Sequence, residues 1–185
     1  MRVISGLRKG HRLKSPKGMD VRPTEDKIKE SLFNIIGKID ESSVVLDLFG
    51  GTGSIGIEFL SRGAKKSYFV DVSPNSISCI KDNLNHTKLN ELAVVIKSDS
   101  IRAIKQLYND KLIFNYIYID PPFRKNQLLT SVLSTLAEYP IMNINSIIII
   151  EHESELVLED KIFNFNKFDE RKYGSKTISF FKSVL

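Results

Sequence analysis

Five short apolar runs recur along the chain, and none of them alternates apolar with polar residues. They span residues 44–49, 67–72, 93–97, 114–120 and 146–151, and they are rich in Val, Ile, Tyr and Phe. Segments of helical character separate them, including one that begins at Ser73-Pro74 and others over residues 100–108 and 125–138. Strands without alternation are buried on both faces, so the pattern predicts a doubly wound, mostly parallel α/β sheet covered by helices.

The two ends of the chain do not follow this alternation of strands and helices. Tyr173-Gly174-Ser175 turns the chain and residues 177–184 form a further predicted strand, which indicates a C-terminal antiparallel hairpin at one edge of the sheet. Residues 1–24 combine glycines with scattered apolar residues, a pattern that favours a short N-terminal β-hairpin extension. We therefore predict a basic hairpin extension over residues 1–24 and an α/β domain over residues 25–185.

The positive charge of the chain is concentrated in the extension. Residues 1–24 contain seven lysines and arginines and a single acid, Asp20, whereas the whole chain has a net charge of +5. A short, strongly basic segment is typical of an arm that binds a polyanion such as RNA, although a solvated basic tail has the same composition. The predicted phosphate-binding residues are Arg8, Lys9, Lys14, Lys17 and Arg22.

Composition excludes several classes of protein. The chain has 185 residues, 42% of them hydrophobic, and no apolar run approaches the roughly 20 residues that a membrane helix needs. Residues 1–10 are basic but no apolar stretch follows them, so we expect no secretory signal. The single cysteine, Cys79, and three scattered histidines indicate neither a disulfide framework nor a metal cluster. We expect a cytoplasmic, metal-free monomer.

A glycine loop follows the first apolar run. Gly51, Gly53 and Gly56 satisfy the G-x-G-x-x-G spacing of dinucleotide-binding folds, and Asp71 ends the next run twenty residues after Gly51. This spacing alone fits any adenosine-containing cofactor. Asp47 stands directly before the loop, where its charge would repel a pyrophosphate but would attract the amino group of S-adenosylmethionine (SAM).

Less specific interpretations of these acids remain open. Asp47 can instead bond loop amides, Asp71 can cap the following helix, and Asp99 can cap a helix, contact the adenine edge, or do both. If the cofactor is SAM, we expect the binding residues to be Asp47, Phe49, Gly51, Thr52, Gly53, Asp71, Asp99 and Ser100.

The fourth apolar run leads directly into Asp120-Pro121-Pro122-Phe123. Two prolines fix the loop and leave carbonyl groups free, and in a doubly wound sheet this edge is where ligands bind. The carboxylate of Asp120 and the carbonyl of Pro121 could each accept an N–H bond from a planar exocyclic amine, with Phe123 stacking on the base. We expect Asp120, Pro121 and Phe123 to be catalytic and Pro122 to contact RNA. A strand-terminating turn with a core phenylalanine is the alternative.

Taken together, the motifs resemble those of one known family. The stretches that carry the resemblance are residues 1–6, Arg22-Pro23-Thr24, residues 33–35, residues 47–54, residues 61–64 and residues 120–123. In this order they closely resemble the RsmD-type 16S rRNA (guanine-966 N2)-methyltransferases of bacteria over essentially the whole chain. This sequence has Gly50 where alanine is usual and Asp71 where glutamate is common, and the shorter acid could require a water to reach the ribose.

The resemblance implies a Rossmann-like methyltransferase domain that uses SAM to methylate the N2 amine of a guanine. It also implies 16S rRNA as the partner, within the 30S subunit or a late assembly intermediate. By position in the motifs, it implies that Asp47, Gly51 and Gly53 contact the methionine end of SAM. Asp71 would then bind the ribose, and Asp99 would lie next to the adenine. Three alternatives stay open: a DNA adenine N6-methyltransferase, an NAD-linked oxidoreductase and a non-enzymatic RNA-binding module.

Overall fold

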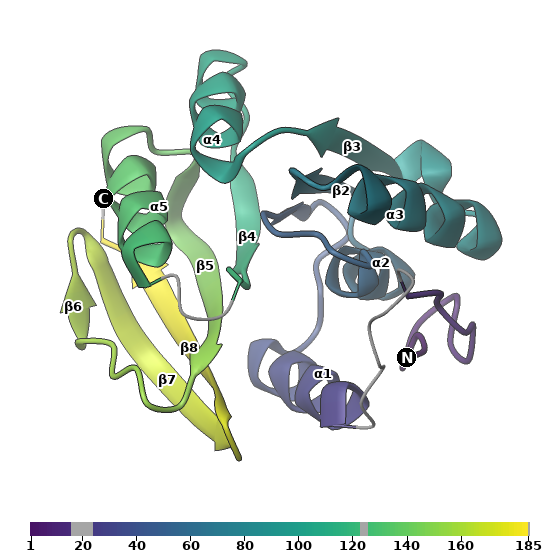
Figure 1. Ribbon diagram of the computed structural model, residues 1–185, viewed down its shortest axis with the longest axis horizontal. Helices are drawn as coiled ribbons and strands as arrows, with labels where there is room; N and C mark the ends of the chain where they lie inside the picture. Colours follow the sequence, from purple (N-terminus) through teal and green to yellow (C-terminus); the bar gives the residue numbers. More distant parts are fainter. Residues whose placement is uncertain (16–23, 123–125, 185) are drawn as a thin grey trace. The chain divides into compact units, whose positions relative to one another are not determined.

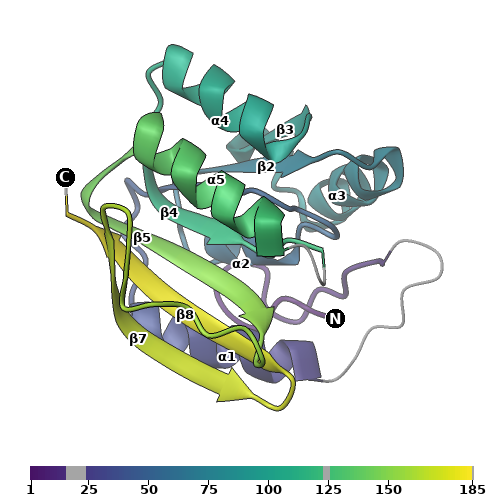
Figure 2. The same ribbon diagram turned by 60° about the vertical axis from the view of Figure 1, so that its left-hand side comes forward.

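The computed structural model describes residues 1–15, 24–122 and 126–184, and its chain forms two compact units (Figures 1 and 2). The first unit comprises residues 1–98 and the second comprises residues 99–185. Lys17, Arg22 and Phe123, three of the predicted site residues, lie outside the described residues. Within the described part of the chain, no helix combines the length and the apolar composition needed to cross a membrane.

The first unit is built on three parallel strands in the order β3-β2-β1. Phe69 of β2 is fully buried between strand and helices, together with apolar residues of α2 and α3. The elements are α1 (Thr24–Ile36), β1 (Val44–Asp47), α2 (Ser54–Ser61), β2 (Lys66–Asp71), α3 (Pro74–Thr87), the 3-10 helix η1 (Asn90–Leu92) and β3 (Ala93–Lys97). Gly37 ends α1 in a left-handed conformation (φ 73°), as its position predicts.

Residues 1–15 fold back on themselves within this unit. The amide of Val3 donates to the carbonyl of His11 (2.9 Å) and the amide of Leu13 donates to that of Met1 (3.1 Å). Val3 and Leu13 are buried in one core cluster with residues of α2 and α3. The purple N-terminal segment lies beside α2 in Figure 1, where the Leu7 amide donates to the Ser61 carbonyl (2.7 Å). A solvated tail would leave these apolar side chains in water, so the interpretation of these residues as a tail is wrong.

The second unit combines parallel and antiparallel strands in the order β4-β5-β8-β7-β6. Among the described strands of this unit, only β4 and β5 pair in parallel. The helices α4 and α5 pack side by side (Figure 2). The elements are α4 (Ser100–Asn109), β4 (Phe114–Ile119), α5 (Asn126–Glu138), β5 (Met142–Glu153), β6 (Lys161–Ile162), β7 (Phe165–Tyr173) and β8 (Lys176–Ser183). Gly174 makes the tight turn between β7 and β8 with φ 61°.

The predicted α/β fold with a C-terminal antiparallel hairpin is confirmed, with two differences in detail. The strand β5 begins at Met142, four residues before its predicted start, because Ser146 holds the polar first part in place. The Ser146 hydroxyl donates to the Phe114 carbonyl (2.7 Å) and accepts from the Asn143 amide (3.0 Å). The two-residue strand β6 is too short to produce a pattern in the sequence.

Candidate active site

The glycine loop links β1 to α2 and has the backbone geometry of a ligand cradle. Gly51 (φ 53°) and Gly53 (φ 77°) adopt left-handed conformations, and Gly53 immediately precedes the first turn of α2. Gly56 is required for another reason: a Cβ atom there would lie 2.3 Å from Cε1 of Phe69. The first two glycines therefore shape the loop, and the third allows α2 to pack closely on β2.

Asp47 lies at the end of β1 with only 2% of its surface exposed. Its Oδ2 accepts a hydrogen bond from the Gly56 amide (3.3 Å). Burial raises the pKa of the Asp47 carboxyl to about 7, and the nearby charge of Asp71 adds to the rise. A cation bound beside this carboxyl would stabilise its ionised form, so the site fits an ammonium group better than a phosphate.

Asp71 connects the loop to the start of α3. Its Oδ2 accepts from the Gly51 amide (2.9 Å) and its Oδ1 accepts from the Ser73 amide (2.8 Å). The cap of α3 is Ser73, whose side chain accepts from the Ser76 amide, so Asp71 does not itself cap the helix. Each carboxylate oxygen keeps a second lone pair, which fits a contact with ribose hydroxyls.

The rest of the loop is held from α3 by a residue that the sequence interpretation missed. The fully buried Asn83 donates to the carbonyls of Thr52 (2.9 Å) and Lys14 (3.0 Å) and accepts from the Lys14 amide (2.8 Å). Asn83 thus ties the glycine loop to the N-terminal segment. The available signal was a polar residue on the apolar face of α3. Phe49 and Thr52 are themselves half-buried.

Asp99 and Ser100 begin α4 in the second unit. Asp99 is the N-cap, and its Oδ1 accepts from the Arg102 amide (2.9 Å). Its side chain is about half exposed, so one carboxylate oxygen stays accessible, whereas Ser100 is buried. The capping role is therefore realised, and the predicted adenine contact of Asp99 stays a prediction.

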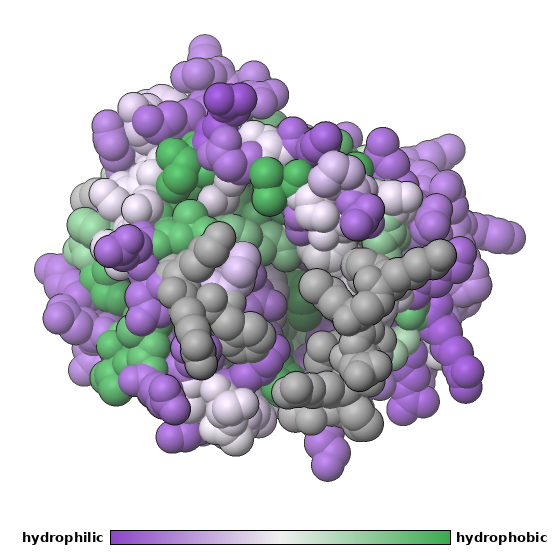
Figure 3. Space-filling view, viewed as in Figure 1, coloured by the Kyte–Doolittle hydropathy of each residue, from purple (hydrophilic) through white to green (hydrophobic). Residues whose placement is uncertain are grey.

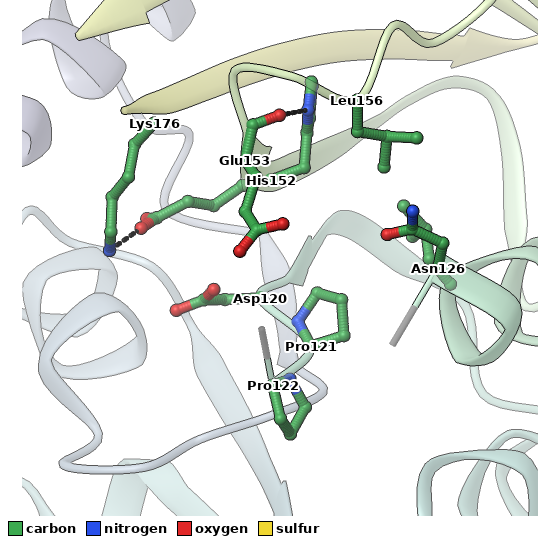
Figure 4. A pocket seen from close by; sticks show the side chains of 10 residues that line it. Asp120, Pro121, Pro122, Asn126, His152, Glu153, Leu156 and Lys176 are labelled. Carbon is green, nitrogen blue, oxygen red and sulfur yellow. Dashed lines mark hydrogen bonds and ion pairs between the residues drawn. The ribbon is translucent and has the colours of Figure 1, made fainter. Parts of the chain in front are cut away.

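The three described residues of the tetrapeptide, which follow β4, line a pocket in the second unit (Figure 4). Asp120, Pro121 and Pro122 form one part of its wall, and the carboxylate of Asp120 faces the pocket. The opposite wall comes from the end of β5 and the start of β8, with Asn126 of α5 at one side. Asp120 and Pro121 thus lie on one wall of the pocket, while their catalytic roles stay predictions. The pocket also contains residues that were not predicted.

A largely buried hydrogen-bond network forms the wall of the pocket on the side of β5 and β8. Glu151 is 6% exposed; its Oε2 accepts from the Tyr118 hydroxyl (2.5 Å) and its Oε1 accepts from the Lys176 ammonium group. The next residue, His152, contacts the Ser179 hydroxyl (2.8 Å) and the Glu153 carbonyl (2.9 Å), and burial lowers its pKa. The sequence does contain a feature that points to Glu151 and His152: polar residues directly follow a run of four isoleucines, Ile147–Ile150.

The described part of the basic extension keeps its cations at the surface. Lys9 and Lys14 are exposed, and the Lys14 ammonium lies 4.0 Å from a carboxylate oxygen of Asp82. Arg8 is half-buried, with its guanidinium 3.5 Å from the Lys88 carbonyl. The surface over α3, at the right of Figure 3, is mostly hydrophilic.

Comparison with known proteins finds a matching family model and relatives that are named as methyltransferases. The family model described as "Conserved hypothetical protein 95" matches residues 1–182. A Bacillus subtilis (strain 168) protein, YlbH, provisionally named as an rRNA methyltransferase, is 37% identical over 182 residues and covers 98% of each chain. The "Ribosomal RNA small subunit methyltransferase D" of Haemophilus influenzae is 36% identical over 156 residues, covering 84% of this chain and 80% of that protein.

The fold of a solved relative agrees with this assignment. The crystal structure of a methylase candidate from Haemophilus influenzae superposes with a TM-score of 0.82 at 31% identity, covering 100% of this chain and 98% of that one. The family model, the identities and the shared fold all extend over nearly the whole sequence. The chain therefore belongs to the RsmD-type methyltransferase family, whose model bears the description "Conserved hypothetical protein 95".

Proposed function

We propose that this protein transfers a methyl group from SAM to the exocyclic N2 amine of a guanine in 16S rRNA. The names of its relatives, which describe small-subunit rRNA methyltransferases, support rRNA as the substrate. The resemblance supports the guanine amine, and it also supports a substrate presented in the 30S subunit or a late assembly intermediate. The observation that carries the proposal is the buried carboxyl of Asp47 at a glycine loop, in a chain that also holds an Asp-Pro-Pro pocket.

Groups of the first unit would hold the methionine end and the ribose of SAM. The Asp47 carboxylate would hold the amino group of the methionine end, Gly51 and Gly53 would let the backbone approach it, and Asp71 would accept from the ribose hydroxyls. When bound, SAM supplies a methyl group on a positively charged sulfur. The residues of the chain have only to bind this group and keep it in one orientation.

The pocket of the second unit fits the needs of a weakly nucleophilic amine. The lone pair of an exocyclic amine is delocalised into the base, so the nitrogen reacts only if it is well oriented. Asp120 and the Pro121 carbonyl would each accept one of its N–H bonds, and both would stabilise the positive charge that develops on the nitrogen. The carboxylate of Asp120 or solvent then takes the proton that leaves. Phe123 would stack on the base.

The basic extension would supply most of the affinity for RNA. Lys9 and Lys14 are exposed, the half-buried Arg8 precedes Lys9, and the charges of Lys17 and Arg22 follow in the sequence. Phosphate contacts of this kind fix a protein on RNA and release counterions, so affinity falls steeply with salt.

Asp120→Asn tests the proposed chemistry. We expect the rate of methyl transfer to unmethylated 30S particles to fall at least about 100-fold, because the variant loses the charge that stabilises the amine. RNA affinity should stay within a few fold. Asp110→Asn, which alters an exposed carboxylate at the end of α4, is the matched control and should leave the rate unchanged. Full activity of the Asp120→Asn variant would refute the role of the tetrapeptide.

The alternatives give different outcomes in binding and labelling experiments. With radiolabelled SAM, 30S particles and duplex DNA, the proposal expects label in 16S rRNA, whereas label only in DNA would identify a DNA adenine methyltransferase. Calorimetry with SAM and NAD separates a methyltransferase from an oxidoreductase. Mass spectrometry of 16S rRNA from a strain without the gene should show one missing methylguanine.

A further inference from the structure

The pocket beside Asp120 contains a second carboxylate, that of Glu153. This residue ends β5, is half-buried, and directs its carboxylate into the pocket that Asp120 also faces (Figure 4). Its backbone is fixed: its carbonyl accepts from the Leu156 amide (3.0 Å) and contacts Nδ1 of His152 (2.9 Å). The amide of Ser154 is in turn bound to the Ser175 carbonyl in the β7–β8 turn (2.9 Å). The side chain therefore projects from a rigid strand end.

The lysine that faces Glu153 is already paired with another carboxylate. Lys176 faces Glu153 across the β5–β8 pair, but its ammonium group bonds the buried carboxylate of Glu151. Within residues 1–15, 24–122 and 126–184, the structure places no hydrogen bond or ion pair on the carboxylate of Glu153. Its carboxylate lies instead at the surface of the pocket, where it can accept hydrogen bonds from a ligand.

The bases that carry an exocyclic amine differ in the group next to that amine, and this difference decides which of them a pair of carboxylates can bind. Guanine has two adjacent donor groups on one edge, the N2 amine and N1–H. Adenine and cytosine each place a lone pair beside their exocyclic amine. A carboxylate accepts hydrogen bonds and cannot donate them, so a second carboxylate beside Asp120 attracts N1–H of guanine and repels the ring nitrogen of the other two bases.

We propose that Glu153 is a specificity-determining residue that accepts a hydrogen bond from N1–H of the target guanine while Asp120 and Pro121 hold the amine. This inference rests on the proposed function and adds the reason why guanine is selected. It also gives the Glu151–Lys176 pair a role: by neutralising Lys176, Glu151 keeps the ammonium group from pairing with Glu153.

A base analogue tests the contact directly. 2-Aminopurine keeps the amine at C2 but has a lone pair at N1, and it can be placed at the target position of 16S rRNA by ligation before the 30S particle is assembled. We expect the wild-type protein to prefer guanine over 2-aminopurine by at least about 100-fold in kcat/KM, because the analogue leaves an acceptor facing an acceptor.

Glu153→Gln should reduce this preference to about tenfold or less, since the new amide can donate to N1 of the analogue. Glu155→Gln, two residues further on and exposed, should behave like the wild type. Thermal unfolding of the variants shows whether they fold, and Glu153→Ala provides a second substitution, which should also narrow the preference. An unchanged preference in both Glu153 variants, or an equal loss of kcat/KM on both substrates, would overturn the inference. Failure of the wild type to methylate any rRNA guanine would instead refute the proposed function.

Discussion

Lys29 and Glu58 form an ion pair inside the first unit, with 3.2 Å between Lys29 Nζ and Glu58 Oε2 and neither side chain more than 3% exposed. Glu58 also bonds Arg62 (2.8 Å) and accepts from the amides of Ile4 (2.8 Å) and Ser5 (2.9 Å). Burial lowers the pKa of Lys29, and the charge of Glu58 partly opposes this change. One buried carboxylate therefore fastens the N-terminal segment to α1 and α2.

Glu58→Gln should destabilise the protein by about 3 kcal/mol, because it leaves a buried ammonium group without its counter-charge. In urea unfolding, the double variant Glu58→Gln, Lys29→Met should lose less stability than the two single variants combined. Hydrogen exchange at the Ile4 and Ser5 amides should become faster in Glu58→Gln. Additive losses would show that the pair is not coupled.

Gly6 and Gly10 provide a matched pair of substitutions in the N-terminal segment. Both have positive φ (79° and 87°), so alanine is strained at either position. At Gly6, however, a Cβ would lie 1.8 Å from the Ser61 carbonyl oxygen, whereas at Gly10 nothing lies within 4 Å. Gly6→Ala should therefore displace the segment from α2 and weaken 30S binding about tenfold, measured by filter binding at fixed salt. Gly10→Ala should cost only about 1 kcal/mol of stability; equal effects on RNA binding would rule out this close approach as the cause.

Asp47 should make cofactor affinity depend on pH. Burial raises the pKa of its carboxyl from the ordinary value of 3.8 to about 7, so the folded state binds more protons than the unfolded state between these values. Stability without ligand therefore falls as pH rises from about 4 to 7, while affinity for a ligand with an ammonium group rises as Asp47 ionises.

Calorimetry with S-adenosylhomocysteine should show about a tenfold gain in affinity from pH 6 to pH 8. Asp47→Asn should bind more weakly at pH 8, lose this pH dependence and unfold at a higher temperature than the wild type at pH 7. A wild-type affinity that is constant over this range would contradict the role of Asp47 as the partner of the amino group.

Lys176 and Glu151 should be coupled in the same way as Lys29 and Glu58, but more weakly. Lys176→Met should cost about 2 kcal/mol, because the buried Glu151 carboxylate then keeps, among the described residues, only its bond to the Tyr118 hydroxyl. Combining it with Glu151→Gln, which removes the charge but keeps that bond, should restore part of the loss in urea unfolding. No recovery in the double variant would mean that Lys176 stabilises β8 by other contacts.

Local patterns in the sequence predicted local features of the structure. Ser73-Pro74 begins α3 as predicted. The stop of α1 at Gly37 and the pairing of Glu58 with Arg62 along one helix are of the same local kind, because each relationship involves residues within a few positions. The burial of β1, β4 and the second half of β5 could be predicted for a related reason, since a strand covered on both faces carries apolar side chains on both. For β3 the prediction is wrong: it lies at the edge of the sheet, and its residues are only partly buried.

Relationships between distant residues could not be predicted in this way. The contacts of Glu58 with Lys29 and with the amides of residues 4 and 5 could not be predicted, because these partners are 29 to 54 positions away in the chain. Asn83 and Glu153 were missed for the same reason: their partners and surroundings come from other elements. The predicted roles of Asp99, Asp120 and the basic residues stay predictions.

The carboxylate of Asp71 spans the amides of Gly51 and Ser73, and this has a consequence for ligand association. The loop and the first turn of α3 are locked together during folding, so their conformational entropy is lost before any nucleoside arrives. A preorganised cradle of this kind binds with little rearrangement and a small entropic penalty. Cofactor exchange should then be governed by escape of the ligand from its contacts rather than by opening and closing of the loop.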